Sequence, residues 1–400
     1  MEKTVCELFA GVGGFRLGLE RTSKDWETVW FSQWEPGKTK QWAHDCYVQH
    51  WGDIDDRTGV DISLVEKDKI PDHNLLVGGF PCQDYSVARP LPGSKGLEGK
   101  KGVLWWQIRD TLEAKQTPFG LFENVDRLLK SPASQRGRDF GIMLACLAAL
   151  GYSAEWRVVN AAQYGAAQRR RRIFIFTYRD DTQYGQSLSK MQPYNIIKFD
   201  GFFARTFPIH SLEERIKEVE LDYNDIPEVS ESFSFNFENA GYMHSGKVFT
   251  TRVEPVEEAP ITLGDILQKD ADEKYFLDDE KIEKWKYLKG AKHIERTSNT
   301  GHKYTFSEGA IPFPDSLDKP ARTMLTSEGT TNRSSHIVCD PQNDRIRILT
   351  PIETERIQGF DDDWTFGMPE RMRYFCMGNA LVVPMITKMG KTLNTIFDSE

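Results

Sequence analysis

The chain has 400 residues, of which 39% are hydrophobic and 28% charged, so we expect a soluble globular protein with one large domain or two. No stretch approaches the roughly 18 consecutive apolar residues of a membrane span, and the first residues do not resemble a secretory signal, which favours a cytoplasmic protein. Six cysteines, none in a Cys-x-x-Cys pair, argue against a disulfide scaffold and a structural zinc, and no metal site is expected.

The negative charge is unevenly placed along the chain. The formal net charge is −9, but residues 211–285 hold 20 acidic against 8 basic residues, a local charge of −12. The rest of the chain therefore carries about +3, with basic clusters around residues 95–101 and 169–172. An acidic total does not exclude a local face that binds nucleic-acid phosphates.

Residues 1–180 alternate short apolar segments with helical patterns. The expected strands are residues 4–9, 28–32, 75–80, 120–123, 152–160 and 172–178. Apolar residues recur at helical spacing from Phe140 to Leu150, and Gly151 follows as the expected C-cap. This alternation predicts an α/β fold with a mostly parallel, doubly wound sheet.

The periodicity fades beyond about residue 190. Residues up to about 315 are acidic, aromatic-rich and turn-rich, which predicts an irregular second domain. Helical patterns return in residues 317–400, with expected helices at 352–359 and 381–396.

A glycine-rich turn follows the first expected strand. Residues 9–15 read Phe-Ala-Gly-Val-Gly-Gly-Phe, and glycines at a strand-to-helix turn let the backbone approach a ligand. Glu35 stands at the end of the second expected strand, where an acidic residue commonly binds ribose hydroxyls. The pattern favours a nucleoside cofactor, and the alternative is a tight turn with a surface glutamate.

A cysteine follows the third expected strand. Cys82 lies in a loop after Pro81, beyond the carboxyl end of the strand, where open α/β sheets bind ligands. This position favours a nucleophile, although most cysteines are buried and inert.

Charged residues mark the next strand end and a later strand entrance. Glu123 and Asn124 follow apolar residues of the fourth expected strand, and residues 169–172 are four consecutive arginines. Because alternate strand residues point the same way, Arg170 and Arg172 are expected on one face. This favours a site for an anion or a base, and the alternative is a solvated basic surface.

Together these segments resemble the DNA (cytosine-5) methyltransferase family of bacterial and phage restriction-modification systems, over almost the whole chain. The matching segments are residues 6–20, 76–89, 123–125, 168–172, 347–360 and 378–379. The resemblance implies a Rossmann-like, S-adenosylmethionine-dependent methyltransferase sheet with a smaller, irregular target-recognition domain. It assigns residues 1–185 to catalysis and cofactor binding and residues 186–315 to target recognition. Residues 316–400 would form a C-terminal segment whose last part packs back onto the catalytic domain.

The resemblance also implies residue roles. Cys82 would add to carbon 6 of a flipped-out cytosine, Glu123 would bind ring nitrogen 3, and Arg172 with Arg170 would orient the base. The implied substrate-binding residues are Gln83, Ser86, Asn124 and Gln168. The implied contacts to S-adenosylmethionine, and to its product S-adenosylhomocysteine, are Phe9, Gly11, Gly13, Phe15, Glu35, Pro36, Asp61, Ile62, Pro81, Leu104, Asn379 and Ala380.

Some of these positions depart from the family pattern or have a competitor. Pro36 replaces an aromatic residue found in many members, and Ala380 replaces a serine. Asp53 is an alternative to Asp61 for the adenine contact, and the spacing to Cys82 favours Asp61.

The expected partner is double-stranded DNA, and the enzyme would protect host DNA alongside a restriction endonuclease that acts on the same site. We expect base contacts from Arg252, Lys292 and Arg296, a monomer, and no membrane partner. One alternative is a transfer-RNA cytosine-5 methyltransferase, which the long segment 185–315 argues against. Another is a catalytically silent DNA-binding relative, although Cys82 and Glu123 are intact.

Overall fold

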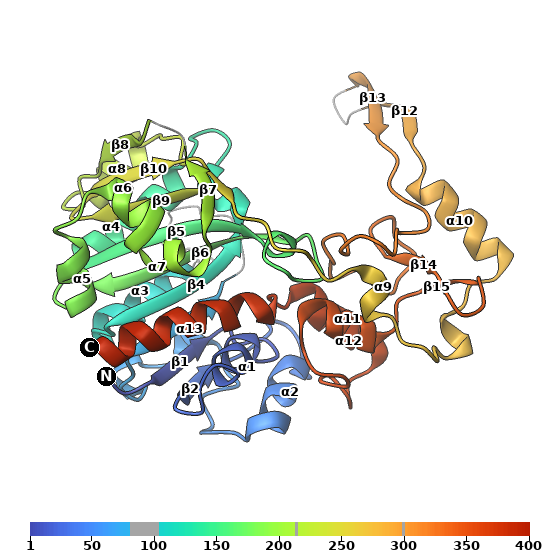
Figure 1. Ribbon diagram of the computed structural model, residues 1–400, viewed down its shortest axis with the longest axis horizontal. Coiled ribbons are helices and arrows are strands. Elements are labelled where there is room, and N and C mark those ends of the chain that lie inside the picture. Colours follow the sequence, from blue (N-terminus) through green and yellow to red (C-terminus); the bar gives the residue numbers. More distant parts are fainter. Residues whose placement is uncertain (81–103, 213–214, 298–300) are drawn as a thin grey trace. The chain divides into compact units, whose positions relative to one another are not determined.

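The computed structural model describes residues 1–80, 104–212, 215–297 and 301–400 (Figure 1). The chain forms two compact units. Unit 1 comprises Met1–Tyr164, Arg171–Glu258 and Val383–Glu400, and unit 2 comprises Gly165–Arg170 and Ala259–Val382.

A nine-stranded sheet forms the centre of unit 1. Its strands lie in the order β2 (Glu27–Ser32), β1 (Thr4–Leu8), β3 (Leu75–Gly79), β4 (Phe119–Val125), β6 (Arg171–Arg179), β5 (Tyr152–Asn160), β9 (Ala240–His244), β10 (Lys247–Thr251) and β8 (Lys217–Glu220). The first four pair in parallel, and all pairings beyond β4 are antiparallel. Six of the nine strands therefore run in one direction, whereas β6, β9 and β8 run in the other. The six strands predicted from the sequence are confirmed, with ends within two residues.

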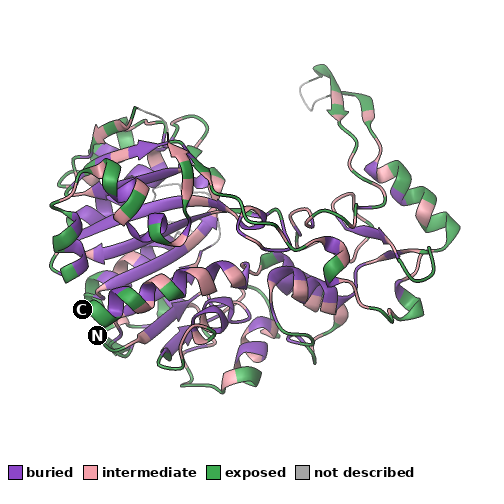
Figure 2. Ribbon diagram, viewed as in Figure 1, coloured by how far each residue is buried: buried purple, intermediate pink, exposed green. Residues whose placement is uncertain are grey.

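Helices cover both faces of this sheet. On one face, α3 (Leu104–Lys115) and α4 (Arg138–Ala149) share one buried apolar cluster with alternate strand residues. On the other face, ring contacts connect α13 (Val383–Ser399) to β4 and α7 (Phe202–Thr206) to β6. Figure 2 shows the strands as a largely buried layer. The arrangement is doubly wound, as the alternating sequence pattern predicts.

Helix α13 brings the C-terminal end of the chain onto α1 (Gly14–Glu20). A Cβ atom at Gly18 of α1 would lie 2.5 Å from the Cβ of Ile386 in α13, so glycine is needed for this close approach. The predicted helix at 381–396 is confirmed as α13, and the helix predicted at 352–359 is confirmed as α11 (Pro351–Gln358).

Shorter elements complete unit 1. They are α2 (Trp42–Trp51), η1 (Ile62–Leu64), η2 (Lys67–Lys69), η3 (Asp126–Lys130), η4 (Ala161–Gln163), α5 (Gln183–Leu188), α6 (Pro193–Asn195), the π-helix η5 (Ile196–Asp200), α8 (Ile226–Ser232), and the paired strands β7 (Ile209–Leu212) and β11 (Val253–Pro255).

The segment expected to recognise the target contributes to both units. Strands β8, β9 and β10 extend the central sheet beyond β5, so residues 186–258 belong to unit 1 by their contacts. The sequence did not reveal these strands, which have four or five residues each and lie where no strand–helix alternation was recognised. The functional boundaries of the three expected segments stay a prediction.

The described residues of unit 2 form helices, two-stranded hairpins and a buried ion-pair cluster at Arg347. Its elements are α9 (Leu263–Ile266), η6 (Glu273–Tyr275), α10 (Asp279–Lys289), α11, α12 (Glu370–Asn379), and two separate hairpins, β12 (Lys292–Thr297) with β13 (Lys303–Glu308) and β14 (Ile337–Cys339) with β15 (Ile346–Ile348). Arg347 donates to Asp340 at 2.7 Å and twice to Glu353 at 2.8 Å. These partners offset the cost of burying the guanidinium charge.

Candidate active site

The carboxyl ends of three parallel strands meet at one edge of the sheet in unit 1. Leu8 at the end of β1 pairs with Gly78 of β3, and Gly79 of β3 pairs with Glu123 of β4. The predicted cofactor turn, the predicted nucleophile loop and Glu123 all follow or lie at these strand ends. This is the edge at which open α/β sheets bind ligands.

Glu123 and Arg172 form an ion pair at this edge. The Nε atom of Arg172 lies 2.8 Å from Oε1 of Glu123, and the side chains are 18% and 13% exposed. The residues are diagonal neighbours, because Val125 pairs with Arg172 and Glu123 with Phe174 across β4 and β6. The guanidinium holds the carboxylate in one orientation, with Oε2 on the side of Gly79.

Asn124 connects the end of β4 to the end of β3. Its buried amide donates to the carbonyl of Phe80 at 3.0 Å, and its Oδ1 accepts from the backbone N–H of Val125 at 2.7 Å. Phe80 immediately precedes Pro81. Pro81 and the predicted site residues Cys82, Gln83 and Ser86 lie outside the described residues. Asn124 is therefore placed to position the backbone from which the predicted nucleophile loop departs.

Arg170 and Gln168 lie in unit 2, unlike Arg172. Strand β6 begins at Arg171, so strand alternation does not extend back to Arg170. The buried guanidinium of Arg170 donates to the carbonyls of Met324 and Gly378, at 3.0 and 3.1 Å. The Gln168 side chain is also buried, donating to Gln358 and accepting from the N–H of Met324. Both side chains hold segment 165–170 in unit 2, and their predicted roles in substrate binding and catalysis stay predictions.

The two glycines Gly11 and Gly13 of the turn after β1 have different surroundings. Phe9 and Gly11 have φ angles of 56° and 57°, and a Cβ atom at Gly11 would meet nothing within 4 Å among the described residues. At Gly13, by contrast, a Cβ would lie 2.2 Å from the ring of Trp51. In the described part of the chain, Gly11 thus has open space beside its backbone, whereas Gly13 allows α1 to pack closely on α2. Phe15 is buried beneath the turn.

Gln33 connects the glycine turn to the loop at Thr58, a contact that the sequence pattern did not indicate. Its Oε1 accepts from the N–H of Gly11 at 2.7 Å, and its own N–H donates to the carbonyl of Thr58 at 2.9 Å. Gln33 stands two residues before Glu35, and Thr58 three before Asp61. In the sequence, only the position of Gln33 directly after the second strand could have suggested this contact.

Glu35 has a carboxylate oxygen that is suited to accept from a sugar hydroxyl. Its buried Oε2 has no hydrogen-bond partner among the described residues. Burial raises the pKa of this carboxyl, against a lowering by the charge of Lys38. A buried polar atom normally has a partner, so the atom fits a ligand that donates hydrogen bonds. The residues present therefore fit the ribose of S-adenosylmethionine.

The two candidate aspartates for the adenine contact are both in local hydrogen bonds. Asp61 caps η1 by accepting from the N–H of Ser63 at 3.0 Å, and the neighbouring Ile62 is buried. Oδ1 of Asp53 accepts from the hydroxyl of Thr58 at 2.6 Å and from the N–H of Ile54 at 2.9 Å. Asp53 thus supports the loop that Gln33 contacts.

The remaining predicted contacts are dispersed. Pro36 follows Glu35, and Leu104 is the first residue of α3 in unit 1. Asn379 ends α12 and Ala380 is its C-cap, in unit 2. Among the predicted base-contacting residues, Arg252 is exposed between β10 and β11, whereas Lys292 and Arg296 lie in β12 of unit 2. Their roles stay predictions.

A buried carboxyl that the sequence analysis did not single out lies beneath the glycine turn. Glu7 of β1 accepts from the hydroxyl of Tyr47 at 3.1 Å, and burial raises its pKa to about 8. The position of Glu7 just before residues 9–15 could have suggested that its side chain lies close to the turn. It supports the turn from inside the sheet.

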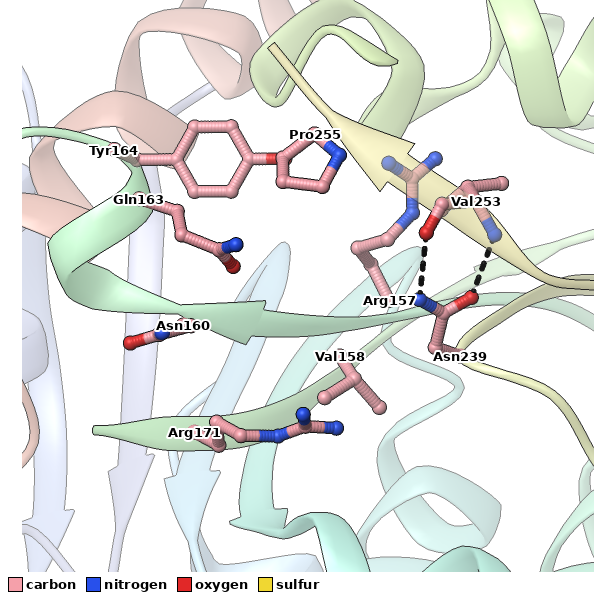
Figure 3. Close-up of a pocket in the computed structure, with 9 residues that line it drawn as sticks. All are labelled: Arg157, Val158, Asn160, Gln163, Tyr164, Arg171, Asn239, Val253 and Pro255. Carbon is pink, nitrogen blue, oxygen red and sulfur yellow. Dashed lines mark hydrogen bonds between the residues drawn. The ribbon is translucent and has the colours of Figure 1, made fainter. Parts of the chain in front are cut away.

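A cavity of about 50 Å³ opens where β5 ends and β6 begins (Figure 3). It is lined by Arg157, Val158, Asn160, Gln163, Tyr164, Arg171, Asn239, Val253 and Pro255. The amide of Asn239 forms two hydrogen bonds of 2.8 Å with the backbone of Val253, which fix one wall. Apart from Arg171, these residues lie outside the motifs of the sequence analysis.

The described part of the chain contains no helix long and apolar enough to cross a membrane. Nor do its His, Cys, Asp and Glu residues form a cluster that could hold a metal ion.

Comparison with known proteins identifies the family. Residues 3–395 match the family described as C-5 cytosine-specific DNA methylase. The chain belongs to this family. The predicted activity of a DNA (cytosine-5) methyltransferase is thereby confirmed.

Individual relatives agree with this assignment. This methylase is 49% identical to the type II methyltransferase M.Sau3AI of Staphylococcus aureus, over 98% of this chain and 95% of the relative. It is 25% identical to the type II methyltransferase M.SsoII of Shigella sonnei, over 98% and 80%. The crystal structure of the S. pombe Dnmt2 methyltransferase aligns with a TM-score of 0.59 at 15% identity, over 99% and 98% of the two chains. This structural likeness confirms the predicted fold class.

Proposed function

We propose that this methylase uses Cys82 to form a transient covalent bond with a cytosine that is flipped out of a specific double-stranded DNA sequence. The observation that carries the proposal is the ion pair of Glu123 with Arg172, on the strand adjacent to the one that leads into Cys82. A carboxyl group held in one orientation can bind ring nitrogen 3 of cytosine. Asn124 supports the same step by holding the backbone of Phe80.

The proposed reaction has three steps. The Cys82 thiolate adds its electron pair to carbon 6, while Glu123 donates or shares a proton at nitrogen 3, so that electron density reaches carbon 5. S-adenosylmethionine supplies the methyl group that carbon 5 takes. A base then removes the proton from carbon 5, the returning electron pair expels the thiolate, and nitrogen 3 gives its proton back to Glu123 as 5-methylcytosine forms. Proton removal is the one step that we assign to no residue.

Residues of unit 1 support cofactor binding. Among the described residues, nothing fills the space beside Gly11, so a ligand can approach the backbone, and nothing donates to Oε2 of Glu35, which can accept from a ribose hydroxyl. Gln33 holds the N–H of Gly11 and thereby the shape of the turn. These residues bind and orient the cofactor and take no part in bond making.

We also propose a role in a type II restriction-modification system. The support is the similarity to two type II methyltransferases over nearly the whole chain. Methylation of the recognition sequence would protect host DNA from an endonuclease that cleaves the same sequence.

The decisive experiment measures methyl transfer onto unmethylated DNA, with every cytosine read at single-base resolution. We expect methylation within one short sequence context. Cys82→Ala should abolish transfer and retain cofactor binding. Cys339→Ala, at a partly exposed position in unit 2, should keep the activity and serves as the matched control. Transfer by Cys82→Ala, or methylation of transfer RNA instead of DNA, would contradict the proposal.

The covalent step can be tested separately. In DNA that carries 5-fluorocytosine at the target position, no proton can leave carbon 5 after methyl transfer, so the thiolate is not expelled. We expect a protein–DNA adduct that survives denaturing electrophoresis with the wild-type enzyme. Cys82→Ala should form none, and an adduct of equal yield in that variant would remove Cys82 from the mechanism.

A further inference from the structure

The hairpin of β12 and β13 is a free-standing ribbon in unit 2. The two strands pair antiparallel over six residues each and form a two-stranded sheet of their own within the described structure. Nine of the twelve residues are exposed, and Figure 2 shows the ribbon mostly as exposed surface. A two-stranded ribbon is at best marginally stable alone in water, so this one depends on its base or on a partner.

The two faces of the ribbon differ in chemistry. Side chains alternate between faces, and residues that pair across the strands share a face. The aromatic face consists of Lys292, Ile294, Arg296, Tyr304, Phe306 and Glu308. The polar face consists of His293, Glu295, Thr297, Lys303, Thr305 and Ser307. All the large apolar side chains of the ribbon therefore lie on one face.

Arg296 is a cation of the aromatic face that stacks on a phenyl ring. Its guanidinium carbon lies 3.9 Å from the ring centre of Phe306, and it has no hydrogen-bond or ion-pair partner among the described residues. Beside it, Ile294 and Tyr304 are 37% and 44% exposed. Stacking on an aromatic ring holds the guanidinium plane and leaves its N–H donors available.

One arginine holds both ends of the ribbon at its base. The NH1 group of Arg333 donates to the carbonyls of Leu288 and Gly290, before β12, at 3.1 and 3.3 Å. The same group lies 3.2 Å from Oε2 of Glu308, and NH2 donates to the carbonyl of Gly309, after β13. The direction of the ribbon relative to the rest of unit 2 thus depends on this side chain.

A buried ion pair anchors the base further. Nζ of Lys289, the residue that ends α10, lies 3.1 Å from Oδ2 of Asp315, and both side chains are buried. Arg322 binds the same carboxylate at 2.6 Å. The backbone N–H of Ile311, three residues after β13, donates to the carbonyl of Lys289 at 2.9 Å. These contacts make the base rigid while the outer part of the ribbon is exposed.

The shape and charge of the aromatic face fit the major groove of DNA. A two-stranded ribbon fits into a groove about 12 Å wide, and arginine binds the guanine edge with two hydrogen bonds. The one acidic residue of the face, Glu308, is paired with Lys292 at 3.5 Å and with Arg333. The face therefore presents Arg296 without a competing carboxylate, whereas the polar face carries Glu295.

We propose that the aromatic face of the ribbon enters the major groove of the recognition sequence, that Arg296 reads a base edge there, and that Arg333 is the residue that positions the ribbon. This inference rests on the proposed function, because it names the surface through which the methylase selects its DNA.

The test compares single substitutions on the two faces. Discrimination is measured as the ratio of binding affinities, and of kcat/KM, for the recognition sequence against duplexes with one altered base pair. Arg296→Gln should lower kcat/KM for the recognition sequence by about 10- to 100-fold and lose discrimination mainly at one base pair. At saturating DNA, kcat and cofactor affinity should stay within about threefold.

Lys303→Gln is the matched control, because it removes one positive charge from the polar face. It should weaken binding to all duplexes by a similar small factor. The slope of the logarithm of affinity against the logarithm of salt concentration should become shallower by about one. Arg333→Met should raise KM for DNA at least about tenfold and reduce discrimination at several base pairs, with little change in kcat. Arg333→Lys should restore part of the loss, because a lysine can still donate to the carbonyls at the base.

The outcomes separate this inference from the function on which it rests. A wild-type enzyme that transfers no methyl group to DNA refutes the proposed function, and the inference with it. A wild-type enzyme that methylates DNA, with discrimination unchanged in Arg296→Gln, overturns the inference alone. Equal loss of discrimination in Arg296→Gln and Lys303→Gln overturns the assignment of the aromatic face. Unchanged KM and discrimination in Arg333→Met remove the positioning role.

Discussion

The amide of Asn124 donates to the carbonyl of Phe80 across 3.0 Å, and this bond joins the end of β4 to the residue before Pro81 and Cys82. The preceding residue, Glu123, is held by Arg172. In the proposed mechanism, these two neighbouring residues of one strand serve two parts of the reaction: Glu123 presents a carboxylate, and Asn124 fixes the origin of the loop that carries Cys82. A displacement of about 1 Å between such groups can cost about 100-fold in rate.

Asn124→Asp should lower kcat by about 10- to 100-fold. The carboxylate keeps the acceptor for the N–H of Val125 but turns an oxygen toward the carbonyl of Phe80, which repels it. Cofactor affinity, measured by calorimetry, should stay within about twofold. Asn74→Asp is the control: it makes the same substitution at an exposed amide-to-carbonyl bond, to Glu2, at the opposite edge of the sheet. A loss of kcat of the same size in both variants would mean that Asn124 acts only on general stability.

Gln33→Met should weaken cofactor binding by about 5- to 30-fold, because the N–H of Gly11 loses its acceptor at 2.7 Å and the turn loses a connection worth about 1–2 kcal/mol. Gln33→Glu keeps an oxygen acceptor of the same size and should bind the cofactor more tightly than the Met variant. The measurement is the dissociation constant of S-adenosylhomocysteine. Identical constants in the two variants would show that the bond to Gly11 does not shape the site.

Arg172→Lys should lower kcat/KM by about 100-fold or more. Arg172 contacts Glu123 through Nε and the carbonyl of Arg171 through NH1, and one ammonium group cannot reproduce this planar geometry. Arg171→Lys, at an exposed position paired with Asp126, should change kcat/KM by less than about threefold. Steady-state kinetics on the recognition sequence checks both values. Equal losses of kcat/KM in the two variants would mean that the arginine segment acts as a whole and that the contact of Arg172 with Glu123 has no special role.

The sequence predicted the parts of the site whose geometry follows from strand periodicity. The strand ends near Gly11 and Glu123 could be located because short apolar segments end at polar or glycine residues. The contact of Glu123 with Arg172 could also have been predicted from the sequence, because both residues stand near the ends of expected strands. Chemistry at a strand end is therefore predictable once the strand is recognised.

Other features depend on contacts that no local pattern encodes. The start of β6 at Arg171 separates Arg172 from Arg170, whose hydrogen bonds to Met324 and Gly378 connect residues more than 150 positions apart. The role of Gln33 arises from a bond across 22 residues. Strands β8 to β10 are stabilised by their neighbours in the sheet rather than by their own short sequences. Such features require the assembled fold.

The stability of unit 1 should fall below pH 6.5 through His73. Its ring is buried: Nδ1 lies 2.8 Å from the carbonyl of Pro71 and Nε2 lies 3.0 Å from the hydroxyl of Thr117. Burial lowers the pKa of His73 to about 4, from about 6.5 in the unfolded chain. Protons therefore bind the unfolded chain first, so stability is fully present above pH 6.5 and is lost as the pH falls toward 4.

Between pH 7.5 and 5.0 this difference corresponds to about 2 kcal/mol of unfolding free energy. His73→Asn does not titrate, so the variant should lose about 2 kcal/mol less than the wild type over this interval, whatever its stability at pH 7.5. Denaturant unfolding at the two pH values measures both losses. Because His73 precedes β3, at the sheet edge opposite Glu123, cofactor affinity of the folded protein should not follow the same titration. Equal losses in the two proteins would assign the acid sensitivity to other groups.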